Sequence, residues 1–119
     1  MSPIKLLFID DDRTMLRIAE EILSQLDLQV WTASSTTEAD DVLKRETVDM
    51  VVCDIQMPGE DGVAYCRRLR ASGFSRPVIL LSAAIDEGII AASGATLCLS
   101  KPFDVMDLHQ RIVALAGKS

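Results

Sequence analysis

An apolar segment in the middle of the chain, residues 50–54, ends on the single carboxylate of Asp54. Turn-forming residues follow it, with Pro58 and Gly59 first and Gly62 shortly afterwards. This pattern indicates a buried strand that delivers one acid to the edge of a sheet. Asp is also a common turn residue, so Asp54 could simply begin the turn. Whether Asp54 is a reactive carboxylate or only a turn residue depends on which other polar residues lie near it.

Three other apolar segments also end on side chains that could act on a phosphate. They are Asp10 and Asp11 after residues 4–9, Ser82 after residues 77–81, and Lys101 after residues 97–100. If these positions meet, the carboxylates repel each other, by roughly 4 kcal/mol for a pair about 4 Å apart at an effective dielectric near 20. A bound Mg²⁺ relieves the repulsion, because it prefers oxygen ligands, takes one or two protein carboxylates and leaves room for a phosphate oxygen.

The remaining groups of this set suit phosphoryl transfer. Lys101 and the Ser82 hydroxyl could hold the phosphate oxygens that a metal ion leaves free. Asp54 could then act as the nucleophile and form an acyl phosphate. The sequence predicts a phosphoryl-transfer site, provided that the fold brings these strand ends together.

Segments of strand composition alternate with segments of helical period along the whole chain. Strands are expected at residues 4–9, 29–33, 48–53, 77–81 and 97–100, and helices at about residues 14–26, 35–46, 62–70, 86–93 and 104–117. Such alternation predicts an α/β fold of five parallel strands with five helices on both faces of one doubly wound sheet. The carboxyl ends of parallel strands share one edge of the sheet, which is where ligands bind in open α/β folds.

Local signals refine three of the expected helices. The first should turn its apolar residues toward the core, namely Met15, Ile18, Ala19, Ile22 and Leu26. The second opens with a capping box, in which Ser35 is the N-cap and Glu38 is expected to reach back to it. The fourth should be short and weak, because it contains Gly88 and two isoleucines.

Composition excludes several classes of function. A chain of 119 residues with 49% apolar and 25% charged residues is typical of one globular domain, expected to span 1–119. No apolar run is long enough to cross a bilayer, and no secretion signal is recognisable. The net charge is −6 without a basic stripe, which argues against direct nucleic-acid binding. Cys53, Cys66 and Cys98 are expected to be reduced thiols, which favours a cytoplasmic protein.

Taken together, these motifs resemble the receiver domain of two-component response regulators, as found in single-domain chemotaxis regulators. The resemblance covers essentially the whole chain and rests on five motifs in order: Asp10-Asp11, Asp54 with Met57-Pro58, Asp61-Gly62, Ser82-Ala83 and Lys101-Pro102-Phe103. It implies a flavodoxin-like sheet in the strand order 2-1-3-4-5. It also implies a phosphorelay switch, in which Asp54 accepts a phosphoryl group from a phosphohistidine of a sensor kinase or phosphotransfer protein.

The resemblance further implies a role for each site residue. Asp11, Asp54 and the backbone carbonyl of Gln56 would ligate Mg²⁺, with Asp10 contacting the ion mainly through a water molecule. Lys101 would pair with the phosphoryl group and precede a cis peptide bond to proline. Ser82 would move toward the phosphoryl oxygen and carry the switch. The domain would catalyse only its own phosphorylation and dephosphorylation and would not otherwise be an enzyme.

Three features depart from the family pattern. Cys98 stands three positions before Lys101, where the family usually has a tyrosine or phenylalanine that rotates with the switch. The segment between Ser82 and Lys101 is shorter than expected by roughly three residues, close to one helical turn. Ala84 has no side chain to position an attacking water, whereas Gln56 could do so. The usual output surface of the family should therefore be altered here.

Two alternatives to a phosphorylated receiver remain open. One is a pseudo-receiver that binds proteins and is never phosphorylated. The other is a haloacid-dehalogenase-like phosphatase, because residues 10–14 match its D-x-D-x-T pattern, with Asp10 as the nucleophile and Asp12 as acid/base. No output domain is recognised in this chain. A receiver would then act by binding another protein, or would belong to a longer regulator.

Overall fold

The computed structural model describes residues 3–117 and shows one parallel sheet of five strands in the order β2-β1-β3-β4-β5. The strands are β1 (Ile4–Ile9), β2 (Leu28–Ala33), β3 (Met50–Asp54), β4 (Val78–Ser82) and β5 (Leu97–Ser100). Every residue of β3 and β4 is buried. Strands covered on both faces read as continuous apolar runs, which is what the sequence has. The predicted α/β class and flavodoxin-like strand order are confirmed.

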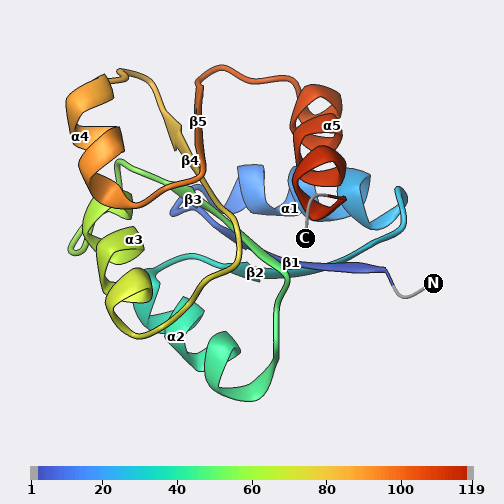
Figure 1. The fold of residues 1–119 in the computed structure, drawn as a ribbon. Coiled ribbons are helices and arrows are strands. Elements are labelled where there is room, and N and C mark those ends of the chain that lie inside the picture. The colour runs from blue at the N-terminus through green and yellow to red at the C-terminus, as the bar shows by residue number, and fades with distance from the viewer. Residues whose placement is uncertain (1–2, 118–119) are drawn as a thin grey trace.

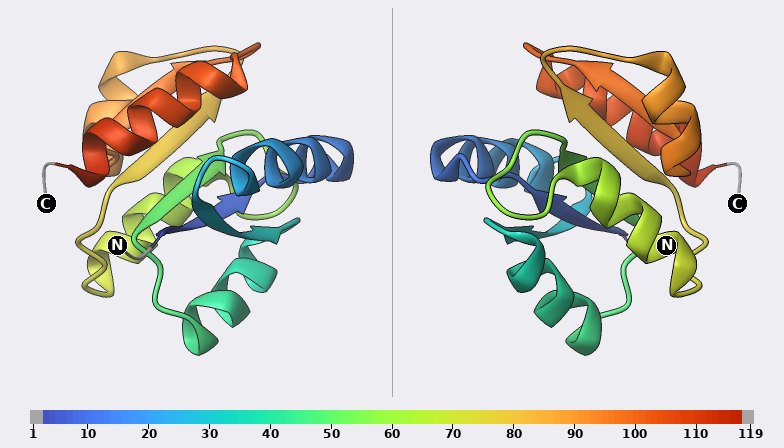
Figure 2. Two further views of the ribbon diagram at one scale, coloured as in Figure 1. Left: turned by 90° about the vertical axis from the view of Figure 1, so that its right-hand side faces the viewer. Right: turned by 90° about the vertical axis from the view of Figure 1, so that its left-hand side faces the viewer.

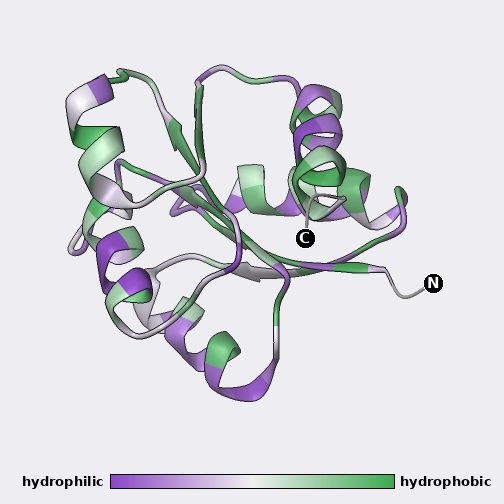
Figure 3. Ribbon diagram, viewed as in Figure 1, coloured by the Kyte–Doolittle hydropathy of each residue, from purple (hydrophilic) through white to green (hydrophobic). Residues whose placement is uncertain are grey.

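The helices form a layer on each face of the sheet (Figure 1). They are α1 (Arg13–Ser24), α2 (Thr36–Arg45), α3 (Gly62–Ala71), α4 (Glu87–Ser93) and α5 (Val105–Ala116). The side views show α1 and α5 over one face, with α3 and α4 over the other beside α2 (Figure 2). Successive strand residues alternate between the two cores: Leu6 and Phe8 pack with α1 and α5, while Leu7 and Ile9 pack with α2 and α3. Figure 3 shows that the strands carry mostly apolar residues and that much of the helix surface carries polar ones.

Each helix begins at a side chain that accepts hydrogen bonds from its first turn. The N-caps are Asp12, Ser35, Asp61, Asp86 and Asp104. Ser35 Oγ accepts from the Glu38 amide at 3.1 Å, as predicted. Glu38 does not return to Ser35, however. Its carboxylate accepts from the backbone amide of Ser34 at 2.9 Å and from the Ser34 hydroxyl at 3.0 Å, so the capping box closes one residue earlier than expected.

The prediction of the inward face of the first helix is confirmed in part: Ala19 is buried, and Met15 and Leu26 pack against the core, but Ile18 and Ile22 do not. Leu16, Ala19 and Leu23 are buried, whereas Ile18 and Ile22 are 42% and 36% exposed. Residues 15–23 carry two adjacent apolar stripes, and helical period alone favours neither. In the structure the stripe of Leu16 and Leu23 packs against the sheet and α5.

The fourth helix is as short as predicted and is held by side chains of α3. It has seven residues and ends at Gly94, whose φ of 84° is in the left-handed region. Arg67 donates to the backbone oxygen of Ala92 at 3.3 Å, and Arg70 donates to that of Gly94 at 2.9 Å. These bonds satisfy carbonyls at the end of a helix that is too short to be stable by itself.

Candidate functional site

The site lies at the point where the strand order reverses, between β1 and β3. Ile9 is paired with Cys53, so the next residues, Asp10 and Asp54, stand side by side at the carboxyl edge. Both are buried, at 0% and 3% exposure. Asp11 is exposed beside them, and all three carboxylates offer oxygens within 4.8 Å of one another. The structure therefore brings together the three acids that the sequence predicted.

Lys101 places its ammonium group between the two buried carboxylates. Its Nζ lies 3.0 Å from Asp54 Oδ2 and 3.4 Å from Asp10 Oδ2. The backbone amide of Lys101 donates to the Ser82 carbonyl at 2.8 Å, and its peptide bond to Pro102 is cis, as the resemblance implied. The end of β5 is thereby attached to the end of β4 and aims the side chain across the sheet edge. Hydrogen bonds between ionised partners are stronger than those between neutral groups.

Burial and ion pairing have opposite effects on the pKa values of Asp10 and Lys101. Burial raises the pKa of Asp10 above its usual value, and the nearby charge of Asp54 adds to the rise, while the Asp12 amide and Lys101 act in the opposite sense. Burial acts to lower the pKa of Lys101, but hydrogen bonds and charges from Asp54 and Asp10 outweigh it and raise that pKa. The ammonium group is thus held charged where it faces two acids.

The Ser82 hydroxyl lies at the end of β4 in a closed set of hydrogen bonds. It donates to the Ala84 carbonyl at 2.6 Å and accepts from the Ala84 amide at 3.1 Å. It also accepts from the side-chain amide of Gln56 at 3.3 Å, while the Gln56 backbone amide donates to Asp54 Oδ1 at 3.2 Å. The sequence analysis expected Gln56 to ligate a metal ion through its backbone carbonyl or to position a water molecule. Nothing in the sequence indicated that its side chain contacts Ser82.

Gly62 has a packing role that the sequence reasoning missed. It was expected only to open α3, yet a Cβ on this residue would collide with the backbone carbonyl oxygen of Asp54. It would also stand 2.9 Å from the Cα of Ile55. The Gly62 amide donates to the Ile55 carbonyl at 2.9 Å, so the loop after β3 folds back tightly on the strand end. Glycine is needed here for close approach of two backbone segments.

The loop after β3 is also tied to the helices beside it. Arg68 makes a bidentate pair with Glu60 at 2.8 and 3.0 Å, and a third bond to Asp40 on α2 at 2.9 Å. The Tyr65 hydroxyl donates to the other oxygen of Asp40 at 2.9 Å. The arginine thus connects α2, α3 and the loop that leaves the site.

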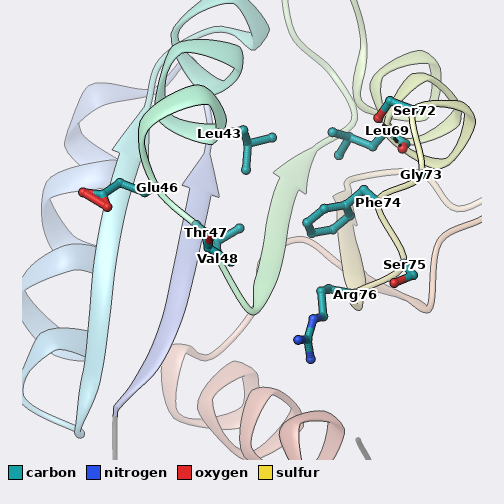
Figure 4. Close-up of a pocket in the computed structure, with 10 residues that line it drawn as sticks. All are labelled: Leu43, Glu46, Thr47, Val48, Leu69, Ser72, Gly73, Phe74, Ser75 and Arg76. Atoms are coloured by element: carbon teal, nitrogen blue, oxygen red, sulfur yellow. Dashed lines mark hydrogen bonds between the residues drawn. The ribbon is translucent and has the colours of Figure 1, made fainter.

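Of two hollows in the surface, one adjoins the candidate site and the other lies away from it. One, of about 420 Å³, adjoins Lys101 and is lined by Asp12, Met15, Ala83, Lys101, Pro102 and Phe103. The other, also about 420 Å³, lies at the opposite end of the sheet between α2 and α3, where Leu43, Leu69 and Phe74 face one another (Figure 4). The second hollow contains none of the predicted site residues.

The residue that replaces the usual aromatic is a half-buried thiol. Cys98 packs against the core on the side of α2, α3 and α4, and burial raises its pKa. Cys53 and Cys66 are fully buried, and all three cysteines are free.

The donor set suits a hard divalent cation. Three carboxylates within one small volume supply only oxygen ligands, and two of them are buried beside a single ammonium group. Oxygen donors with one exposed member, Asp11, fit an ion that binds through a few carboxylates and otherwise keeps water. These residues could hold a metal ion.

Known proteins share this fold and these sequence features. The family model for the response regulator receiver domain matches residues 6–113. The response regulator MprA of Mycobacterium sp. (strain KMS) is 34% identical over 120 residues, a match that covers 98% of this chain and 52% of that protein. The chain therefore spans about half the length of the curated relatives it matches.

Solved structures agree with the family match. The receiver domain of a Francisella response regulator superposes with a TM-score of 0.90 at 28% identity, covering 97% of this chain and 98% of that one. The chemotaxis protein CheY4 of Vibrio cholerae shares the fold, with a TM-score of 0.88 at 23% identity over 95% of this chain and 98% of its own. Within residues 3–117, none of the helices has the length and hydrophobicity needed to cross a membrane. The chain belongs to the receiver domain family of the response regulators of two-component signalling.

Proposed function

We propose that this receiver domain is a phosphoacceptor switch in which Asp54 receives a phosphoryl group from a phosphohistidine. The observation that carries the proposal is the position of Lys101 Nζ, 3.0 Å from Asp54 Oδ2 and 3.4 Å from Asp10 Oδ2, beside three clustered carboxylates. A cation so placed can neutralise the charge of an incoming phosphoryl group, and transition states of this kind demand charge neutralisation and positioning.

In the proposed reaction an oxygen of Asp54 attacks phosphorus as the phosphorus–nitrogen bond of the donor breaks. The electron pair of that bond leaves on the imidazole. Mg²⁺ is the proposed cofactor, held by Asp11, Asp54 and the carbonyl of Gln56, with Asp10 close by, and it would neutralise phosphoryl oxygens. Lys101 would hold one phosphoryl oxygen, and the Ser82 hydroxyl would move to donate to another. The domain would catalyse these steps only on itself.

The proposed partners follow from this chemistry. A histidine kinase or a histidine phosphotransfer protein would supply the phosphoryl group, and a downstream protein or an output domain would respond to the switch. Phosphorylation adds about −1.5 to −2 charge, which alters a region that is already acidic. The free thiols support a reducing compartment, and the cytoplasm is the proposed setting.

The test is labelling by acetyl phosphate or by a phosphorylated kinase, with and without Mg²⁺. Wild-type protein should incorporate one phosphoryl group only with Mg²⁺, and Asp54→Ala should incorporate none. Asp41→Ala removes an exposed acid of α2 outside the site and should label normally. Borohydride trapping and peptide mapping locate the modified residue. Modification at Asp10 would support the phosphatase alternative, and no labelling of wild type would favour the pseudo-receiver.

A further inference from the structure

The hydrogen-bonding capacity of the Ser82 hydroxyl is fully used in this structure. A hydroxyl has one hydrogen to donate and two lone pairs that accept. The hydrogen goes to the Ala84 carbonyl, because the other two partners, the Ala84 amide and the Gln56 side-chain amide, can only donate. Ser82 is 0% exposed, so water does not compete for these positions.

This arrangement opposes the movement that the switch requires. Donation to a phosphoryl oxygen on Asp54 needs the single hydroxyl hydrogen, so Ser82 must first release the Ala84 carbonyl. Rotation of the hydroxyl also turns its lone pairs away from Gln56. Two of the three bonds must therefore be broken or rebuilt before Ser82 can take part.

Gln56 is placed to link the hydroxyl to the acceptor carboxylate. Its backbone amide donates to Asp54 Oδ1 at 3.2 Å, and its side chain donates to Ser82 Oγ at 3.3 Å. The residue thus spans the ends of β3 and β4 and contacts both groups that would change state. Gly62 holds the same loop against the carbonyl of Asp54, which limits how far Gln56 can move.

We propose that Gln56 is a positioning residue, a latch whose side-chain amide holds the Ser82 hydroxyl in its resting arrangement. This inference rests on the proposed function, because the latch regulates the response to a phosphoryl group on Asp54. By stabilising the resting state alone, the latch weakens binding of any ligand that needs Ser82 in its other arrangement. One neutral hydrogen bond of ordinary strength changes such an affinity roughly 2- to 10-fold.

Beryllofluoride with Mg²⁺, a phosphoryl mimic, tests the latch in a double-mutant cycle. Gln56→Met keeps the length of the side chain and removes the donor. It should bind beryllofluoride roughly 2- to 10-fold more tightly than wild type. The same substitution in the Ser82→Ala background should have no effect, because the hydroxyl that the latch holds is gone. An equal effect of Gln56→Met in both backgrounds, or no effect in either, would overturn the latch.

A second measurement needs neither metal nor phosphoryl mimic. Loosening Ser82 should free the Ala84 amide that donates to it, so hydrogen exchange at Ala84 should be several-fold faster in Gln56→Met than in wild type. An unchanged exchange rate would contradict the latch while leaving phosphorylation of Asp54 intact. Failure of wild type to bind beryllofluoride at all would overturn the proposed function, and the regulatory role of the latch with it.

Discussion

Gly62 packs directly on the backbone carbonyl of Asp54, so that no side-chain atom fits between the first residue of α3 and the last residue of β3. A Cβ at this position would also stand 3.0 Å from the carbonyl carbon of Asp54. The neighbouring atoms belong to backbone and cannot rotate away. The position of the acceptor acid therefore depends on a glycine eight residues further along the chain.

Gly62→Ala should destabilise the domain by about 3 kcal/mol, because the added methyl group forces two backbone segments apart. The displaced segment carries Asp54, so phosphoryl acceptance should fall as well. Gly88→Ala is the matched control: its Cβ meets only the Asp86 side chain at 3.4 Å, and the change should be neutral or stabilising by up to about 1 kcal/mol. Urea denaturation of both variants measures the difference. Equal stability of the two variants would show that the loop yields to the methyl group.

Lys101→Met should strengthen Mg²⁺ binding while it weakens phosphoryl acceptance. Removing the ammonium group takes a positive charge from beside the proposed metal ligands, and a unit charge at about 4 Å is worth about 1 kcal/mol even in bulk water, or roughly fivefold in affinity. Lys5→Met makes the same change near the start of β1 and should alter neither property. Calorimetric titration with Mg²⁺ and acetyl phosphate labelling measure the two effects. Weaker Mg²⁺ binding in Lys101→Met would contradict the assignment.

Arg70→Ala should cost about 2 kcal/mol of folding free energy, because one guanidinium group serves four acceptors. It donates to the carbonyls of Phe74, Arg76 and Gly94 and to the Thr96 hydroxyl. Arg67→Ala loses a single bond to Ala92 and should cost less than about 1 kcal/mol. Chemical denaturation compares the two arginine variants. A smaller loss in Arg70→Ala than in Arg67→Ala would show that the four bonds add no stability.

The pKa of Glu60 should rise in Arg68→Ala. Hydrogen bonding to Arg68 is the main cause that lowers the pKa of Glu60 in the folded protein. A carboxyl group with a lowered pKa adds stability above its unfolded-state pKa, and this stability is lost as the pH falls through the folded-state value. Arg68→Ala should therefore be less sensitive to acid over that range. An NMR titration of the Glu60 carboxyl carbon checks the shift, with Arg67→Ala as the control that should leave it unchanged.

The sequence was sufficient for the architecture and for the members of the site. Continuous apolar strands alternating with helical segments imply parallel strands covered on both faces, and parallel strands end on a common edge. Which of these end residues become neighbours depends also on the strand order, which the resemblance to receiver domains implied and which the structure has as β2-β1-β3-β4-β5. Asp10, Asp54 and Lys101 were predictable for this reason, although 91 positions separate the first from the last.

Packing, and not the sequence pattern, decided which face of α1 is buried and which serine Glu38 contacts. Two apolar stripes of α1 satisfy the same helical period, and packing on the sheet buried Leu16 and Leu23 rather than Ile18 and Ile22. In α2, Glu38 could reach either of two adjacent serines, and the path of the chain before the helix selected Ser34.

The residue types and their order along the chain determined by themselves which groups lie at the carboxyl edge of the sheet, because hydrophobic period and the alternation of strands with helices can be read along the chain. Tertiary structure alone decided the contacts between those groups. The bond from Gln56 to Ser82 joins residues 26 positions apart, and the fit of Gly62 against Asp54 depends on the path of a loop. Such contacts depend on backbone positions to within a fraction of an ångström, and only the packing of the two helical layers on the sheet sets those positions.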